Sequence, residues 1–147
     1  MINYCKDKVK TVALQYQNLC SHFPNSKCEF NGNDFIWQYY LQPTKTSKKY
    51  LLTLKYDGKY PKAYLYNQGI LRSKSDYVVH TLKSKFKSKN EEYVQLCLYY
   101  PEKHEWNKYM FISETIVPWA LSWLYYYEIW RVTGEWLGGG IEHERSK

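Results

Sequence analysis

Cys97 lies where an apolar segment of the chain turns into a polar loop. The segment begins at Glu91 as Glu-Glu-Tyr-Val-Gln-Leu, the loop opens at Pro101, and Trp106 follows the thiol by nine residues. A thiol at the end of a strand can be held rigidly and still be reached by a second molecule, which suits a nucleophile. Cysteine also packs as a small hydrophobic side chain. On this stretch alone, the pattern favours an inert, buried Cys97.

His80 is the second residue whose type suits catalysis. It precedes Cys97 by 17 residues, which is too far for a fixed local motif, so only the fold can bring the two together. Its imidazole would either hydrogen-bond the backbone of a strand, or support the loop around the thiol and act as a base for an attacking amine. The sequence favours the structural role.

The other potential metal ligands do not form a recognisable motif. No two cysteines are spaced as CxxC, and no paired zinc-ligand spacing occurs among Cys5, Cys20, Cys28 and His22. We therefore predict no metal site, no cofactor and reduced thiols. The N-terminus is charged by residue 6 and has no apolar run, so no cleavable signal peptide is visible and we expect a cytoplasmic protein.

Two helices are predicted around these residues. Apolar side chains recur at helical spacing over residues 3–23, with Asn3 as a possible N-cap and Pro24 as the end. A second helix follows Thr115, has Pro118 in its first turn, carries an aromatic stripe and stops at Gly134. The stripe consists of Trp119, Trp123, Tyr126, Tyr127 and Trp130. Its apolar run is short and is interrupted by charges, so we expect it to cover a sheet and not to span a membrane.

The segments between the helices predict an antiparallel meander. Aromatic and β-branched residues are typical of strands over 35–41, 50–56 and 62–66, with an Asp57-Gly58 turn before the last of these. Residues 28–30 are a hairpin partner or an early part of the first strand. The stretch 77–82 is apolar and short. Together these elements give the α+β class.

Composition limits the size and the partners of the protein. The 147 residues, of which 44% are hydrophobic, predict one domain over 1–147. The net charge is +7, but the lysines are spread along the chain, so we expect neither nucleic acid nor a membrane as partner. Aromatic residues make up 19%, and a rich core or a homodimer interface would equally account for them.

The order helix, meander, extended active-site stretch and helix resembles the ubiquitin-conjugating fold. Tyr60-Pro61 looks like the Tyr-Pro turn that this family places before its third strand. Leu96-Cys97-Leu98 resembles the Cys-Leu that carries the family's catalytic thiol, and Trp106 resembles the tryptophan that follows at about that distance.

The C-terminal half is similar to a narrower group, the stand-alone conjugating-enzyme-like proteins of bacterial anti-phage operons called CBASS. The similarity covers about residues 50–140. It rests on Leu-Cys97-Leu-Tyr-Tyr-Pro101, Glu105-Trp106, Thr115-Ile-Val-Pro118-Trp119, Trp123-Leu-Tyr-Tyr-Tyr-Glu128-Ile-Trp130 and Thr133-Gly-Glu-Trp136-Leu-Gly-Gly-Gly140.

This resemblance implies thioester chemistry at Cys97. In the family, the cysteine takes the C-terminal carboxyl of a protein as a thioester and passes the acyl group to an amine, usually a lysine. In the bacterial systems the donated protein would be the cyclic-oligonucleotide synthase encoded beside the conjugating protein. Lysines near the thiol, at 83–89, 103 and 108, would favour the thiolate if they lie close in space.

The chain also departs from the family pattern. Eukaryotic members carry His-Pro-Asn before the cysteine, and the Asn supports the loop and the oxyanion; here the nearest match is His80-Thr81-Leu82. Three alternatives to conjugation stay open, and this departure motivates the first of them. They are a docking module for the synthase that has lost catalysis, a hydrolase using Cys97 and His80, and a nucleic-acid binder.

Overall fold

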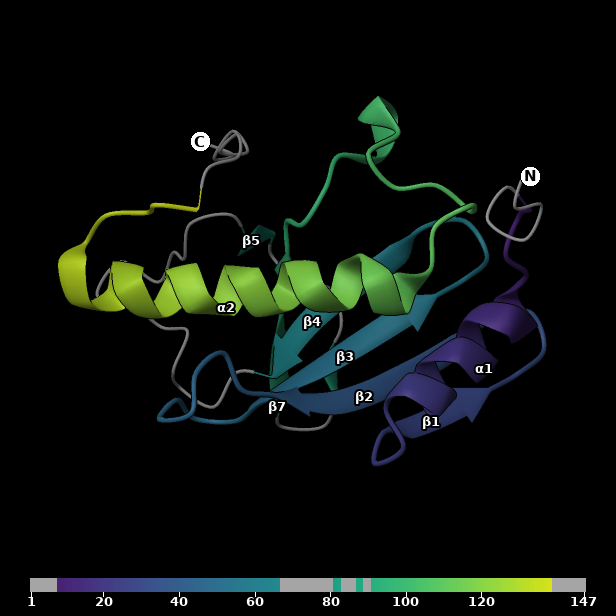
Figure 1. Ribbon diagram of the computed structural model, residues 1–147, viewed down its shortest axis with the longest axis horizontal. Coiled ribbons are helices and arrows are strands. Elements are labelled where there is room, and N and C mark those ends of the chain that lie inside the picture. Colours follow the sequence, from purple (N-terminus) through teal and green to yellow (C-terminus); the bar gives the residue numbers. More distant parts are fainter. Residues whose placement is uncertain (1–7, 67–80, 83–86, 89–90, 139–147) are drawn as a thin grey trace, which may run out of the picture.

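The computed structural model describes residues 8–66, 81–82, 87–88 and 91–138. Two helices, α1 (Val12–His22) and α2 (Ile116–Thr133), lie on one face of an antiparallel sheet (Figure 1). The strands are β1 (Lys27–Phe30), β2 (Phe35–Leu41), β3 (Tyr50–Tyr56), β4 (Pro61–Tyr66), β5 (Thr81–Leu82), β6 (Lys87–Ser88) and β7 (Glu91–Leu96). Two short 3₁₀ helices, η1 (Pro101–Lys103) and η2 (Ile112–Glu114), connect β7 to α2. The α+β class and its similarity to the ubiquitin-conjugating fold are confirmed.

The sheet runs in the order β1-β2-β3-β4-β7-β5, and β6 also pairs with β7. The predicted strands 35–41 and 50–56 are confirmed, and the third begins one residue earlier than predicted, at Pro61. The segment 27–30 is the hairpin partner of β2. Of the predicted stretch 77–82, the structure describes Thr81–Leu82, which pair with β7.

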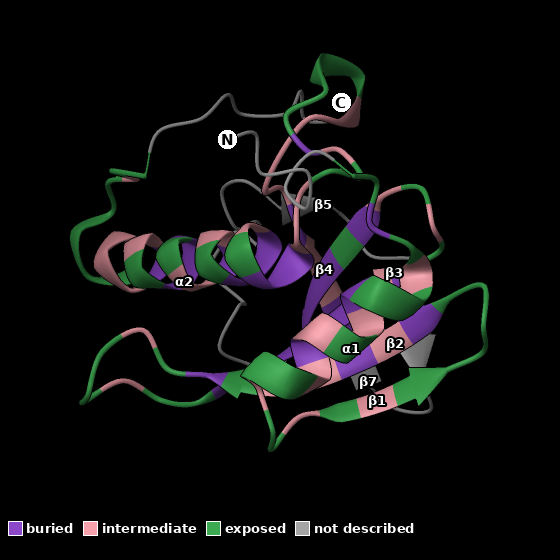
Figure 2. Ribbon diagram, turned by 45° about the vertical axis from the view of Figure 1, so that its right-hand side comes forward, coloured by how far each residue is buried: buried purple, intermediate pink, exposed green. Residues whose placement is uncertain are grey.

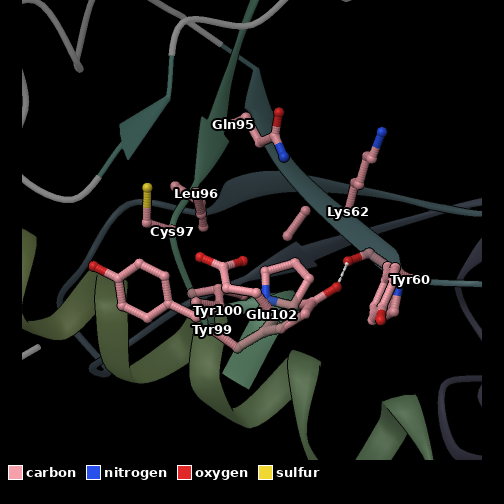
Figure 3. Close-up of a pocket in the computed structure, with 12 residues that line it drawn as sticks. Tyr60, Lys62, Gln95, Leu96, Cys97, Tyr99, Tyr100 and Glu102 are labelled. Carbon is pink, nitrogen blue, oxygen red and sulfur yellow. Dashed lines mark hydrogen bonds between the residues drawn. The ribbon is translucent and has the colours of Figure 1, made fainter. Parts of the chain in front are cut away.

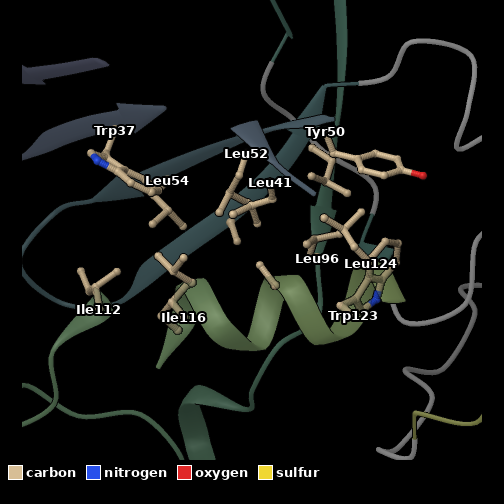
Figure 4. Close-up of a cluster of buried hydrophobic side chains, with 14 of the residues drawn as sticks. Trp37, Leu41, Tyr50, Leu52, Leu54, Leu96, Ile112, Ile116, Trp123 and Leu124 are labelled. Atoms are coloured by element: carbon tan, nitrogen blue, oxygen red, sulfur yellow. The ribbon is translucent and has the colours of Figure 1, made fainter. Parts of the chain in front are cut away.

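Alternation along β2 sends Phe35, Trp37 and Leu41 into the core, whereas three consecutive residues are buried in the central strand β3. Trp37 and Leu54 are cross-strand partners and are both fully buried. Phe23, next to α1, packs on Trp37, and Tyr127 of α2 packs on Tyr50, so both helices share one core with the sheet. Figure 2 shows this buried face between the layers, and Figure 4 shows its central side chains. Each fully buried large apolar side chain stabilises the fold by about 1.5–3 kcal/mol.

Helix α1 begins at Val12, so the predicted start at residue 3 is wrong. Thr11 is its N-cap, with its side-chain oxygen accepting the Leu14 N–H at 3.1 Å. The backbone N–H of Lys10 donates to the Lys108 carbonyl at 2.7 Å. This long-range bond holds residue 10 outside the helix, which begins only after Thr11. Asn3, the predicted cap, lies outside the described residues.

Helix α2 begins and ends as its sequence signals predict. Pro118 lies in the first turn, and Gly134 caps the C-terminus in the left-handed region at φ 79°. Of the predicted aromatic stripe, Trp123 and Tyr127 are buried and the other three are half-buried. The rest of the buried face is aliphatic and consists of Ile116, Val117, Ala120 and Leu124. Among the described residues, no helix is long and apolar enough to cross a membrane.

A buried glutamine, which no sequence pattern indicated, links α1 to the segment before α2. Gln15 of α1 is 0% exposed. Its amide nitrogen donates to the Met110 carbonyl at 2.8 Å, and its amide oxygen accepts the Ile112 N–H at 3.0 Å. A buried carboxamide is stable only when both its donor and its acceptor are used. Gln15 therefore fixes the segment that leads from the loop after β7 into α2.

Candidate active site

Cys97 follows directly on the last residue of β7, as the sequence predicted. Leu96 is 4% exposed and pairs with Thr81, while Gln95 pairs with Tyr64 of β4. These bonds on both sides of β7 hold the strand up to the residue before the thiol. Cys97 itself is half-buried, so the thiol is rigidly placed and still open to a partner.

A cavity of about 290 Å³ lies beside the thiol (Figure 3). One wall comes from the turn into β4 and the other from the end of β7 and the following loop. The lining residues are Tyr60, Pro61, Lys62, Ala63, Gln95, Leu96, Cys97, Leu98, Tyr99, Tyr100, Pro101 and Glu102. Most of this surface is apolar and aromatic, with a few polar groups. A mostly apolar lining with a few polar groups is typical of a binding pocket.

The wall formed by residues 60–63 is shaped by a tight turn. Asp57 accepts the N–H groups of Lys59 and Tyr60 on one carboxylate oxygen, at 2.9 and 3.3 Å. Gly58 sits at φ 90°, where a side chain would be strained. Burial alone would raise the pKa of Asp57, but these backbone N–H groups and Lys62 lower it on balance. The carboxylate therefore stays ionised and keeps the turn closed at physiological pH.

Tyr99 joins the two walls of the cavity. Its hydroxyl donates to the Pro61 carbonyl at 2.5 Å (Figure 3), and its ring lies 6.4 Å from that of Trp119 in α2. Burial raises the pKa of the Tyr99 phenol well above its ordinary value, so the hydroxyl stays protonated and remains a donor. The loop after Cys97 is thereby tied to β4 and to α2.

The loop closes through a second anchor. Trp106 is 1% exposed, packs edge-on against Tyr56 at 5.7 Å, and donates its indole N–H to the Thr115 hydroxyl at 3.0 Å. His104, between the two anchors, is exposed and adopts the left-handed conformation that ends η1. His104 is thus a solvated loop residue, whereas Trp106 fixes the path of the loop.

Burial governs the electrostatics of the thiol. It raises the pKa of Cys97 to about 12, so the resting group is the protonated thiol at neutral pH. The lysines at 83, 85 and 89, which were expected to favour the thiolate if they lay close in space, are outside the described residues. Lys103 places its ammonium 5.0 Å from the centre of the Tyr100 ring.

The remaining cysteines and His80 do not line the described part of this cavity. His80 and Cys5 are outside the described residues. Cys20 of α1 and Cys28 of β1 are half-buried thiols close to each other, and burial together with Cys20 raises the pKa of Cys28 to about 12. In the described ranges, no three His, Cys, Asp or Glu side chains come together as a metal ion would require.

Sequence reasoning did not find the opposite wall of the cavity. Tyr100 and Gln95 are close to Cys97 in the chain, and this closeness could have indicated that they line the same cavity. Tyr60–Ala63 precede Cys97 by more than 30 residues, and only the Tyr-Pro turn pointed to them. Their place beside the thiol follows from the β4–β7 pairing.

A family model described as "Type II CBASS E2 protein" matches residues 15–144, which is most of the chain. No curated protein matches the sequence.

Proposed function

Because the chain belongs to the family of Type II CBASS E2 proteins, we propose that it forms a thioester through Cys97 and transfers a protein's carboxyl end to an amine. E2 denotes the ubiquitin-conjugating class, and the family acts in CBASS anti-phage defence. The proposed acyl donor is the operon's cyclic-oligonucleotide synthase, and the proposed acceptor is a lysine amine in the bacterial cytoplasm.

The observation that carries this proposal is the position of Cys97. The thiol is half-buried at the end of a strand paired on both sides, and it opens onto a cavity lined mainly by apolar and aromatic groups. Rigid placement next to a binding surface is what a covalent nucleophile needs. Cys20 and Cys28, the other described cysteines, do not line this cavity.

The chemistry is an acyl exchange. The Cys97 sulfur attacks the carbonyl carbon of an already activated carboxyl end, such as a thioester on an activating enzyme, and that leaving group departs with its electron pair. An amine then attacks the new thioester, an amide forms, and Cys97 is released as a thiol. Because burial raises the pKa of Cys97 to about 12, the proton must leave as the donor docks. His80 remains a proposed supporting residue for this step.

Co-expression with the neighbouring synthase tests the proposal. We expect a synthase-sized mass increase that reductant removes in the wild type, no adduct in Cys97→Ala, and a reductant-stable ester in Cys97→Ser. Cys28→Ala is the matched control, since that thiol is also half-buried with a raised pKa, and it should behave as the wild type. An adduct that survives Cys97→Ala would refute Cys97 as the nucleophile.

A docking module without catalysis is the second candidate. The raised pKa of Cys97 favours it, because a protonated thiol reacts slowly. This candidate predicts a non-covalent complex with the synthase that is equally tight in the wild type and in Cys97→Ala. It also predicts that no covalent species forms, even when a candidate activating enzyme is added.

A further inference from the structure

We propose that Cys20 and Cys28 are a redox modification site, at which a small-molecule disulfide converts the two thiols into a reversible disulfide that fastens α1 to β1. Neither thiol lines the cavity beside Cys97, so the inference does not depend on the proposed function. In reducing compartments, disulfides occur mainly as transient bonds that sense the redox state.

The packing of α1 on β1 places the two cysteines opposite each other. The rings of Tyr16 in α1 and Phe30 in β1 are stacked, with their centres 4.7 Å apart. Cys20 follows Tyr16 by four residues, about 6 Å along the same face of the helix. Cys28 precedes Phe30 by two residues, about 7 Å along the same face of the strand. Because the two elements are antiparallel and lie side by side (Figures 1 and 2), both steps run in the same direction, and the cysteines face each other as the rings do.

Contacts beyond the cysteines hold the other end of this pairing. Phe23, the C-cap of α1, packs edge-on against Trp37 at 5.4 Å, and Trp37 is the cross-strand partner of Cys28. The Ser26 N–H donates to the Phe23 carbonyl at 3.0 Å and closes the turn between α1 and β1. The side chains of Cys20 and Cys28 share a hydrogen bond between these two sets of contacts. The proposed disulfide therefore forms within the existing packing of the helix on the strand.

The reaction is a thiol–disulfide exchange in which a low-molecular-weight disulfide, such as oxidised glutathione, is the oxidant. The Cys20 sulfur, as its thiolate, attacks one sulfur of that molecule, and a glutathione thiolate leaves with the bonding pair. The Cys28 sulfur then attacks the Cys20 sulfur of the mixed disulfide, and the second glutathione thiolate leaves in the same way. The two protein protons pass to the two leaving thiolates. The protein thus loses two electrons and two protons, and one oxidised glutathione becomes two reduced ones.

The surroundings of Cys28 decide the order of the two attacks. Burial, reinforced by Cys20, raises the pKa of Cys28 to about 12, so Cys28 is a slow first nucleophile. Once Cys20 is part of a mixed disulfide, it carries no negative charge that would oppose the ionisation of Cys28. The second attack is also intramolecular, and groups held next to each other react at a high effective concentration. The mixed disulfide should therefore be short-lived.

The test is to incubate the folded full-length chain with oxidised glutathione, block the remaining free thiols and digest the protein. Trypsin cleaves after Lys27 and separates the two cysteines, so the disulfide appears as linked peptides 11–27 and 28–45. We expect this linked pair, its loss on addition of dithiothreitol, and little glutathione on either cysteine. Because the bond closes a loop of nine residues, from Cys20 to Cys28, it should raise the midpoint of thermal denaturation by about 5–10 °C over the reduced wild type.

Two variants separate pairing from the oxidation of single thiols. Cys28→Ser should accumulate glutathione on Cys20, because no second thiol displaces it, and its midpoint should not rise on oxidation. Cys20→Ser should be modified at Cys28 far more slowly, because burial still opposes ionisation of that thiol. The inference is overturned if the wild type carries glutathione on either cysteine without linked peptides, if neither cysteine reacts, or if either pairs with Cys5 or Cys97 instead. A linked pair that leaves the midpoint unchanged would equally overturn the fastening of α1 to β1.

Discussion

The half-buried thiol of Cys97 should react with small disulfides far more slowly than a cysteine in an unfolded chain. Burial raises its pKa to about 12, whereas a free cysteine titrates near 8.5. At pH 7.5 the thiolate fraction is then about 3 × 10⁻⁵ in the folded protein and about 0.1 in the unfolded chain, a ratio of roughly 3,000. A thiolate of higher pKa is more nucleophilic, which recovers a factor of about 30–50. The net expectation is a rate about 100-fold lower.

The assay is a time course with 4,4′-dithiodipyridine, quenched in acid and resolved by peptide mass spectrometry. The same protein in denaturant is the reference. Peptide-level resolution is needed because Cys28 also has a pKa raised to about 12, by burial and by Cys20, and should be slow as well. Between pH 7 and 9.5 the rate of folded Cys97 should rise about tenfold per pH unit without levelling off, while the unfolded reference bends near 8.5.

Two results would refute this reasoning. One is a pH profile of folded Cys97 that levels off at or below pH 8.5, which would mean that an unseen positive charge or donor stabilises the thiolate. The other is a rate at pH 7.5 equal to that of the unfolded chain. If the slow rate is found, the same assay is repeated with the synthase present. A faster reaction of Cys97 would then mean that docking changes the surroundings of the thiol.

Two further predictions concern the contacts that hold the site. Tyr99→Phe removes the hydrogen bond to the first residue of β4, so the free energy of unfolding should fall by about 0.5–1.5 kcal/mol. Thermal denaturation measures this loss, with Tyr109→Phe, which changes an exposed tyrosine, as the control. Equal stability of the two variants would contradict the prediction. Glu128→Ala removes the carboxylate that accepts the Tyr50 hydroxyl at 2.9 Å, and the unsatisfied hydroxyl should cost about 1–3 kcal/mol. Urea denaturation measures this cost, and the control is Glu135→Ala, which changes an exposed acidic residue just past α2. Equal shifts of the midpoint in the two variants would contradict the prediction.

Local signals in the sequence predicted most of the elements. Strands 35–41 and 50–56 and the start and end of α2 follow from residues within a few positions of each boundary, such as Pro118 and Gly134. Steric and hydrogen-bonding preferences of this kind act over one or two turns. The end of β7 at Leu96, and hence the place of the thiol, was readable in the same way.

Contacts between distant parts of the chain decided the rest. A bond from Lys10 to Lys108 ties the residue before the N-cap of α1 to the loop after β7, and buried Gln15 pairs with backbone groups at 110 and 112. Propensity cannot anticipate either, since both depend on segments more than 90 residues away.

The candidate site shows the same division. The sequence by itself determined which thiol stands at a strand end, and its motifs indicated the family. Only the tertiary structure brought Tyr60–Ala63 against Cys97 to form a cavity, and only the resulting desolvation set the pKa of that thiol. The physical reason is that burial is a property of everything packed around an atom, whereas the sequence specifies only its neighbours along the chain.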